Sequence, residues 1–393
     1  MPSLVRLITS FDNDRPDDSG LPGWAYHDEA YFQREMERVI RPAWQIVCHI
    51  SDLDRAGAYR TFRLLGESVL VVRTQNGDIR AFSNVCRHRG MRLIDGEHGC
   101  VQRLVCPYHA WAYALDGRLT GVPMKGDYPT LDMRENGLVN IDLEIWQGFV
   151  FIRLTDEGGP SVAEMMAPAE AEIAPYRFAE MRPIGTTWAR ERRVNWKNVG
   201  DNYSDNLHIP VAHNGLTRLF GKSYKIEAHG WCDRMSGVLA DTPSDDFWER
   251  FYQAHLPPVP HLPEAAQRRW LYWKLWPNMA FDIYADQIDF MHWVPIGPTT
   301  TELRVMSYAL PDSFMPDEGR RKMKLVRYAN ERINRVVNRE DTWLIERVQA
   351  GMQSRFFTAG PLAASEVCLR SFNARIRKII PETHLPHPPE SYA

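Results

Sequence analysis

The stretch NWKNVGDNYSDNLHIPVAH, residues 195–213, decides how the rest of the chain is interpreted. Asp205 and His208 lie three residues apart, a spacing that places two side chains on one face of a helix. Apolar residues recur at steps of three and four, at Trp196, Val199, Tyr203 and Leu207. This periodicity predicts a helix with a buried face. Pro210 should break or kink the helix because proline has no N–H to donate, and we expect His213 to turn back toward His208.

Two histidines and a distant carboxylate would together form a face of three ligands. That donor set suits non-haem Fe(II) and leaves coordination positions open for O2. By itself, however, H-x4-H is a weak pattern, and ordinary polar residues at a helix end explain it equally well. The other motifs of the chain favour the metal interpretation.

Composition and charge describe an ordinary globular protein. The 393 residues are 44% hydrophobic and 25% charged, and the length predicts two or three domains. Lys+Arg is 47 and Asp+Glu is 50, a net charge of −3 that predicts neither a nucleic-acid partner nor a membrane anchor. No stretch approaches the roughly 20 apolar residues of a membrane span. Residues 1–15 do not have the pattern of a secretory signal, and the six cysteines have no disulfide-scaffold spacing, so we expect a reducing cytoplasm.

The first part of the chain predicts one helix followed by short strands. Asp28 can cap a helix that runs through Ile40. From Gly57 the segments TFRLLG, SVLVVRT and IRAFSNV are strand-like, and Asn76-Gly77 predicts a hairpin between the last two. Asp116-Gly117 predicts a second tight turn. Several short strands joined by such turns indicate a small β-sandwich.

Two mixed Cys/His pairs lie within this predicted sandwich. Cys86 and His88 form C-x-H, and after 17 intervening residues Cys106 and His109 form C-x2-H. Two thiolates and two imidazoles can hold zinc, or a Rieske [2Fe–2S] cluster with the cysteines on one iron and the histidines on the other. Structural zinc fingers usually keep their cysteines together and their histidines together. The mixed pairs therefore favour the Rieske cluster, with zinc as the minor alternative.

These motifs carry a family resemblance. CRHRG and CPYHAW resemble the Rieske motifs of aromatic ring-hydroxylating oxygenases (Rieske non-haem iron oxygenases), large subunit, and D-x-x-H-x4-H resembles the mononuclear-iron motif of the same family. The likeness covers about residues 40–350. Ala110 stands where the family usually has glycine, and Trp111 matches an aromatic residue that should shield the cluster. The remaining cysteines are interpreted as ordinary core or surface thiols: Cys48, Cys100, Cys232 and Cys368.

The domain plan follows from a turn-rich break at residues 155–160. We expect residues 1–42 to be an N-terminal segment and helix that pack on the catalytic domain, residues 43–157 to be the Rieske domain, and residues 158–393 to be the mononuclear-iron catalytic domain. From Trp270 the aromatic and β-branched runs predict an antiparallel sheet, and residues 318–353 predict one or two long helices. The fold class is therefore α+β. The resemblance implies that the catalytic domain is a helix-grip sheet around the iron.

The resemblance also implies roles for single residues. Asp341 matches the family's C-terminal metal carboxylate and is assigned as the third ligand of Fe(II), beside His208 and His213. A solvated helix charge is the alternative, and Glu340 is the competitor, about 100° away on a helix. Asp205 is expected to bridge His208 to a Rieske histidine, His109, of the neighbouring subunit in a head-to-tail homotrimer. Asn202 is expected near the iron, although a structural role for it is equally plausible.

The function that the resemblance implies is that of a terminal oxygenase. Electrons from NAD(P)H reach it from a flavin reductase, directly or through a ferredoxin, and O2 is used to hydroxylate an aromatic or related small organic substrate. The absence of G-x-G-x-x-G after a strand agrees with a separate electron donor. Two alternatives stay open: oxidative N- or O-dealkylation of an amine, quaternary ammonium or methoxy substrate, and a Rieske electron carrier without oxygenase activity. The substrate-pocket candidates, which also form a stripe typical of a sheet core, are Phe220, Phe281, Asp282, Tyr284, Phe290, Met291 and Trp293.

Overall fold

The computed structural model describes residues 18–155, 158–185, 187–285 and 287–390. The prediction that residues 1–15 are not a secretory signal concerns residues outside these ranges. The described chain divides into two compact units. The small unit comprises residues 41–162, and the large unit comprises residues 1–40 and 163–393. Among the described residues, no helix combines the length and the apolar character needed to cross a bilayer.

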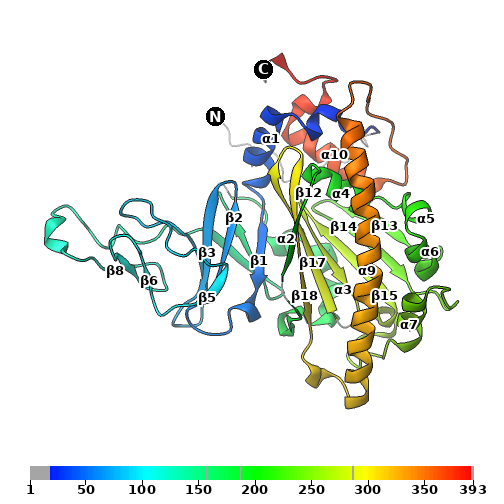
Figure 1. Ribbon diagram of the computed structural model, residues 1–393, viewed down its shortest axis with the longest axis horizontal. Helices are drawn as coiled ribbons and strands as arrows, with labels where there is room; N and C mark the ends of the chain where they lie inside the picture. The colour runs from blue at the N-terminus through cyan, green and yellow to red at the C-terminus, as the bar shows by residue number, and fades with distance from the viewer. Residues whose placement is uncertain (1–17, 156–157, 186, 286, 391–393) are drawn as a thin grey trace. The chain divides into compact units, whose positions relative to one another are not determined.

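The small unit consists of short antiparallel strands in three sheets (Figure 1). One sheet has the order β1 (Gln45–His49), β10 (Phe149–Arg153), β9 (Asp142–Trp146). The second has the order β4 (Ile79–Ser83), β3 (Glu67–Arg73), β2 (Ala58–Leu64), β5 (His98–Cys100). The third has the order β6 (Leu104–Val105), β7 (Ala112–Tyr113), β8 (Leu119–Gly121).

Both predicted turns of the small unit are confirmed. Strands β3 and β4 pair antiparallel around Asn76-Gly77, and Gly77 has φ of 91°, which a side chain would disfavour. Gly117 joins β7 to β8 with φ of 87°. A Cβ at Gly117 would also lie 2.5 Å from the ring of Phe82, so the position requires glycine for space as well as conformation.

The large unit is built on an antiparallel sheet of eight strands. Seven follow the order β11 (Arg182–Pro183), β18 (Thr300–Ala309), β17 (Gln287–Gly297), β16 (Met279–Ile283), β15 (Arg269–Leu275), β14 (Cys232–Val238), β13 (Lys225–His229), and β12 (Trp188–Arg192) also pairs with β18. The aromatic run FDIYADQIDFMHW is not one strand, because the Tyr284 N–H donates to the Gln287 carbonyl at 2.9 Å and separates β16 from β17. The predicted antiparallel sheet is confirmed.

Helices complete the large unit. They are α1 (Glu29–Glu35), α2 (Val162–Met165, at the junction with the small unit), α3 (Glu170–Ile173), α4 (Trp196–Ser204), α5 (Ile209–Ala212), α6 (Asn214–Phe220), α7 (Phe247–His255), α8 (Glu264–Gln267), α9 (Asp317–Met352) and α10 (Val367–Ile379). Asp28 caps α1 by accepting from the Tyr31 N–H at 2.8 Å, and a π-helical turn at Met36–Ile40 extends that helix as predicted. The long charged segment forms a single helix, α9, which runs across one face of the sheet (Figure 1).

The prediction that Asp205 and His208 share a helix face is wrong. Helix α4 ends before Asp205, whose backbone is extended, and His208 is the N-cap of the separate helix α5. Pro210 lies in the first turn of α5, where its missing N–H has no partner to lose and its fixed φ suits a helix start. Proline therefore begins a helix here instead of ending one, and both residues lie in the loop between α4 and α5.

Candidate functional site

Two loops of the small unit have the same backbone design. In the first, the Cys86 N–H donates to Met91 and the Gly90 N–H donates back to Cys86, at 2.8 and 3.0 Å. In the second, the Cys106 N–H donates to Trp111 and the Ala110 N–H donates back to Cys106, at the same two distances. Gly90 and Ala110 occupy equivalent positions, with φ of 73° and 55°. Alanine in this left-handed conformation costs roughly 1–2 kcal/mol, which the rest of the loop must offset.

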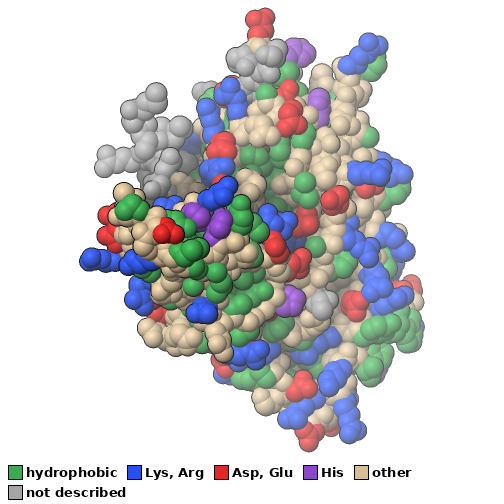
Figure 2. Space-filling view, turned by 60° about the vertical axis from the view of Figure 1, so that its left-hand side comes forward, with side chains coloured by type: hydrophobic (Ala, Val, Ile, Leu, Met, Phe, Trp, Pro, Cys, Tyr) green, Lys and Arg blue, Asp and Glu red, His purple; other side chains and the backbone are tan. Residues whose placement is uncertain are grey.

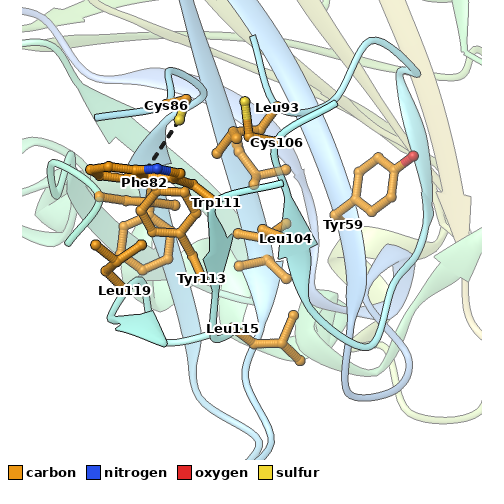
Figure 3. Close-up of a cluster of buried hydrophobic side chains, with 13 residues drawn as sticks. Tyr59, Phe82, Cys86, Leu93, Leu104, Cys106, Trp111, Tyr113, Leu115 and Leu119 are labelled. Carbon is orange, nitrogen blue, oxygen red and sulfur yellow. Dashed lines mark hydrogen bonds between the residues drawn. The ribbon is translucent and has the colours of Figure 1, made fainter. Parts of the chain in front are cut away.

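The loops bring two thiols and two imidazoles together. The ring centroids of His88 and His109 are 4.7 Å apart, and the Nδ1 atom of each ring is buried without a hydrogen-bond partner. Buried polar atoms rarely lack a partner, so two orphaned imidazole nitrogens side by side fit metal ligands. Cys86 and Cys106 are each 2% exposed, and Figure 3 shows both sulfur atoms at one edge of the apolar core. The four residues therefore fit a Rieske cluster.

The surroundings of these four side chains suit a buried, polarisable group. Trp111 stacks on His88 at 4.9 Å with 6° between the ring planes. The Tyr113 hydroxyl lies 3.3 Å from Cys86 Sγ and accepts from the Arg87 N–H at 3.0 Å, which directs its own proton toward the sulfur. Burial raises the pKa of the Cys86 thiol, and burial together with the charges of His88 and Arg89 lowers the pKa of His109. A neutral His109 is the form that binds metal.

The large unit brings the three predicted iron ligands together. His208 and His213 flank the single turn of α5, and Asp341 comes from α9; their ligand atoms all lie within 4.8 Å of one another. The two imidazole rings are 4.9 Å apart at 77°. The Nδ2 atom of Asn202, at the end of α4, lies 3.5 Å from His208 Nε2, on the same side as the ligand atoms. Two imidazoles and one carboxylate with this spacing fit a non-haem Fe(II) site.

Carboxylates hold the outer nitrogen of both imidazoles. Asp205 Oδ2 lies 2.9 Å from His208 Nδ1, and Glu340 Oε2 lies 2.8 Å from His213 Nδ1. The Nε2 atoms face Asp341 instead, whose Oδ1 lies 2.9 Å from His213 Nε2 and 3.8 Å from His208 Nε2. The Nδ1 atoms of both histidines, which face away from Asp341, are thus fixed by hydrogen bonds. Histidine ligands of metal centres are usually held in this way.

The charges around His208 and His213 favour the binding of a cation. Burial opposes the ionisation of Asp205, but its hydrogen bonds with His208 and with backbone N–H groups lower its pKa. Burial likewise opposes the protonation of His213, but Asp341 and Glu340 raise its pKa. The raised pKa of His213 reflects the negative charge of the two carboxylates beside it, which a bound metal ion would neutralise.

An acidic side chain and several aromatic rings lie together on the sheet face next to the three predicted iron ligands. The Tyr203 hydroxyl, on α4, donates to Asp282 Oδ1 at 2.5 Å. Asp282 pairs with Tyr272 across β15 and β16, and the Tyr203 ring lies 6.4 Å from Tyr272 and 5.8 Å from Trp293. Burial and the nearby charges of Asp289 and Asp341 raise the pKa of Asp282 to about 7 despite the Tyr203 bond. A carboxylic acid with such a raised pKa, hydrogen-bonded to a tyrosine and lying near Asp341, is a candidate functional group.

The other pocket candidates divide between two faces of the sheet. Met291 pairs with Ala280 in the adjacent strand and lies on the face that carries the carboxylate. Phe281 and Phe290 pair with each other on the opposite, buried face, so the structure does not bring them to the ligands. Tyr284 follows β16 and accepts a hydrogen bond from α9, and Phe220 is buried at the end of α6.

Comparison with known families agrees with both sites. Residues 178–382 match the family described as the ring hydroxylating alpha subunit (catalytic domain), and residues 43–132 match the Rieske [2Fe-2S] domain. The chain belongs to the ring-hydroxylating oxygenase alpha subunits. As a Rieske oxygenase alpha subunit, it is the terminal oxygenase of a multicomponent system, with a [2Fe–2S] cluster, a mononuclear iron, O2 as co-substrate and electrons from NAD(P)H through partner proteins. The predicted family, fold class and enzyme class are confirmed.

Similar alpha subunits include monooxygenases. The chain is 28% identical over 369 residues to choline monooxygenase of Amaranthus tricolor, covering 91% of this chain and 77% of that protein. It is 35% identical over 199 residues to the carnitine monooxygenase oxygenase subunit of Escherichia coli K12, covering 50% and 53% of the two chains. A crystal structure of a quaternary ammonium Rieske monooxygenase superposes with a TM-score of 0.76 at 23% identity, over 93% of this chain and 96% of that one, which shows the fold.

Three residues of this alpha subunit were missed by the sequence analysis. Tyr113 carries no motif signal beyond an aromatic residue after CPYHAW. Tyr203 was assigned only to the buried face of a helix, and Glu340 only as a rival of Asp341. Each contacts a residue that is distant in sequence, 27, 79 and 127 positions away respectively. Only the folded chain reveals these pairs.

Proposed function

We propose that this Rieske oxygenase removes an N-methyl group from a positively charged amine, with release of formaldehyde. The observation that carries the proposal is the carboxylate of Asp282, surrounded by aromatic rings on the sheet face beside the iron ligands. Hydroxylation of a neutral aromatic ring is the competing function, and a neutral ring gives no reason for an ionisable acid at this position.

The metal assignments underlie this function. We assign Cys86, Cys106, His88 and His109 to the cluster, within residues 43–157, and His208, His213 and Asp341 to iron, within residues 158–393. Bound there, the cluster would supply electrons singly and the ferrous ion would activate O2 next to the substrate. Asn202 lies where its amide could donate to a small molecule at the iron. The orphaned ring nitrogens and the geometry of the two histidines and one carboxylate support these assignments.

Charge is the main support for a cationic substrate. Within the part of the chain that the structure describes, no basic side chain forms an ion pair with Asp282, whose hydrogen-bond partner is Tyr203. Asp282 and Tyr272 remain partly exposed although they lie in central strands of an eight-stranded sheet. Aromatic faces attract ammonium groups by about 0.5–2 kcal/mol each, more when water is excluded. A methylated ammonium would satisfy both the acid and the rings, and the related choline and carnitine monooxygenases are named for such compounds.

Asp282 and Tyr203 would together bind and orient the substrate. Tyr203 donates to Oδ1 of Asp282, so the other carboxylate oxygen is left to face the cation. One oxygen atom enters a C–H bond of the N-methyl group, and the other leaves as water after two electrons and two protons arrive from the donor. The resulting N-hydroxymethyl compound then splits into the demethylated amine, formaldehyde and a proton. The protein's part is to exclude the wrong substrate and to hold the methyl group at the reacting site.

We also propose a homotrimer in which Asp205 links two subunits. The Asp205 side chain is 21% exposed and holds His208 by its outer nitrogen, so it can accept from His109 of the neighbouring subunit. Apolar side chains close to the ligands support such an interface: Val105 and Tyr108 are 39% and 54% exposed in the small unit, and Leu207, Val211 and Trp343 are 47%, 81% and 55% exposed in the large unit. Figure 2 shows histidine side chains at the surface beside hydrophobic and basic ones. A reducing compartment such as the cytoplasm suits the six cysteines, all of them among the described residues, because none of them forms a disulfide bond.

A substrate panel with a surrogate reductase tests the proposal. We expect choline-like ammonium compounds to give formaldehyde in step with O2 uptake, and their uncharged carbon isosteres to give neither. Asp282→Asn should weaken binding of the cation at least tenfold while it leaves the cluster spectrum and the iron content unchanged. Equal turnover of the uncharged isostere, or turnover of arenes alone, would reject a cationic substrate. Metal analysis should find about three irons per chain.

A further inference from the structure

We infer that Glu340 is a positioning residue for the iron site: its carboxylate accepts the Nδ1–H of His213 and fixes that ring with Nε2 turned toward Asp341. The inference rests on the proposed assignment of His213 as an iron ligand. The sequence makes Glu340 a rival of Asp341 for the metal, but the Glu340 carboxylate lies on the other side of the His213 ring from the ligand atoms.

The backbone of His213 is already fixed by two helices. Its N–H donates to Ile209 at 2.9 Å, and its carbonyl accepts from Thr217 at 3.0 Å, so it closes α5 and opens α6. The remaining freedom is rotation of the side chain. A half-turn of the ring would exchange each nitrogen for a carbon and remove the lone pair from the metal side. A hydrogen bond to Nδ1 prevents that rotation and selects the tautomer that leaves Nε2 free.

Two consecutive residues of α9 hold the two nitrogens of this one ring. Asp341 Oδ1 lies 2.9 Å from Nε2, and Glu340 Oε2 lies 2.8 Å from Nδ1. Consecutive helical residues diverge by about 100°, so the side chain that reaches the far nitrogen must be the longer one. Glutamate provides the additional methylene. Aspartate at position 340 would fall short by roughly one C–C bond, about 1.5 Å, while it kept the charge.

The two histidines differ in where their supporting carboxylates originate. Asp205 belongs to the same loop as His208 and also accepts from two backbone N–H groups, so that loop supports its own ligand. His213 is 2% exposed and receives its support from Glu340 of α9, which lies 127 residues away in the sequence. Glu340 therefore joins α9 to the histidine segment as well as orienting the ring.

The test is Fe(II) affinity of the full-length chain, measured anaerobically by competition with a chromophoric chelator. We expect Glu340→Ala and Glu340→Asp to weaken Fe(II) binding by about 10–100-fold, and Glu340→Gln, which keeps both the length and an acceptor oxygen, to stay within a few-fold of the parent. Co(II) substituted for iron should give altered visible bands in the alanine and aspartate variants, a readout that does not depend on turnover. The cluster spectrum confirms that each variant is folded.

Controls separate failure of this inference from failure of the proposed function. Glu331→Ala, which removes an exposed ion pair with Arg335 on the same helix, should leave affinity unchanged. Parent-like affinity in Glu340→Ala, with iron lost in His213→Ala, would overturn the inference alone. Retention of iron by His213→Ala would overturn the ligand assignment itself. Loss of iron in Glu340→Ala but not in Asp341→Ala would make Glu340 the ligand and reject the positioning role. If the alanine variant does not fold, equal affinities of the glutamine and aspartate variants would also reject it.

Discussion

The four proposed cluster ligands of the small unit come from two neighbouring loops, whereas the proposed iron ligands of the large unit come from an interhelical segment and from Asp341 of α9, 128 residues after His213. Their surroundings differ too. The cluster ligands lie against an apolar core of residues such as Leu70, Phe82 and Trp111. The two histidines proposed to bind iron are each hydrogen-bonded to a carboxylate, His208 to Asp205 and His213 to Glu340. A centre assembled from local loops needs little more than a rigid core, but one assembled from distant segments needs fixed polar contacts between those segments.

Helix α4 illustrates that need in the large unit. Lys197 is completely buried and lies 2.7 Å from the buried Glu35 of α1, and its Nζ also donates to the Ala25 carbonyl and to Asn195 Oδ1, each at 2.8 Å. The Tyr26 hydroxyl donates to Asp201 at 2.7 Å. These bonds connect the N-terminal segment to the helix that leads into the iron loop. Every added hydrogen bond offsets part of the cost of burying the charges.

The largest expected effect comes from removing one ligand in each unit. His88→Ala should lose the cluster and retain the lone iron, and His208→Ala should do the reverse, because each ligand set is completed within its own unit. Both variants should have no detectable turnover. EPR of the reduced cluster and metal analysis would check this, with about one iron expected in the first variant and about two in the second. Loss of both metals from either variant would contradict the independence of the two centres.

The next effect concerns the buried ion pair. Lys197→Met should lower the free energy of unfolding by about 3–5 kcal/mol, because Glu35 would be left charged and buried without its partner. Chemical denaturation followed by tryptophan fluorescence measures this loss. The matched control is Lys322→Met, which removes an exposed pair with Glu318 and should cost less than about 1 kcal/mol. Equal losses would mean that the buried pair does not anchor α4.

Replacement of Asp282 should raise the free energy of unfolding instead of lowering it, because we expect this carboxylate to serve function at the cost of stability. Its pKa is raised from 3.8 to about 7 in the folded chain, so ionisation removes stability as the pH rises between these values. Asp282→Asn should therefore stabilise the metal-free protein at pH 8 by about 1–3 kcal/mol, and by less at pH 5. Thermal unfolding at both pH values measures the difference. A gain independent of pH would show that the carboxylate is not the source.

The smallest expected effect is a tuning of the cluster. Tyr113→Phe removes the hydroxyl that faces Cys86 Sγ, a hydrogen bond that stabilises the more negative, reduced state. A bond worth about 0.5–1.5 kcal/mol corresponds to a potential lower by roughly 20–60 mV for one electron. A redox titration followed by circular dichroism would detect the change. An unchanged potential would assign Tyr113 a packing role only.

The sequence by itself determined whatever depends on residues close together in the chain. Cys86, His88, Cys106 and His109 are recognisable because each pair fits one loop, and the Asn76-Gly77 hairpin and helix α9 follow from local turn chemistry and periodicity. The same local rules gave His208 and His213 as a pair. They were wrong about the end of the preceding helix, which stops before Asp205, and about Pro210, because proline can either break one helix or start the next.

Tertiary structure alone decided which distant residues support those ligands. Nothing in the sequence pairs Glu340 with His213, Tyr203 with Asp282 or Glu35 with Lys197. Strand alternation places Asp282 and Phe281 on opposite faces of the sheet, but it does not say which residue lies on which face. The turn after Tyr284, between β16 and β17, is visible only in the structure. Sequence separations of 79 to 162 residues divide these partners, and no periodicity extends over such distances. The physical reason is that the packing of whole helices and strands determines which buried donor meets which acceptor. The two residues become neighbours only after elements such as the sheet and α9 have packed together.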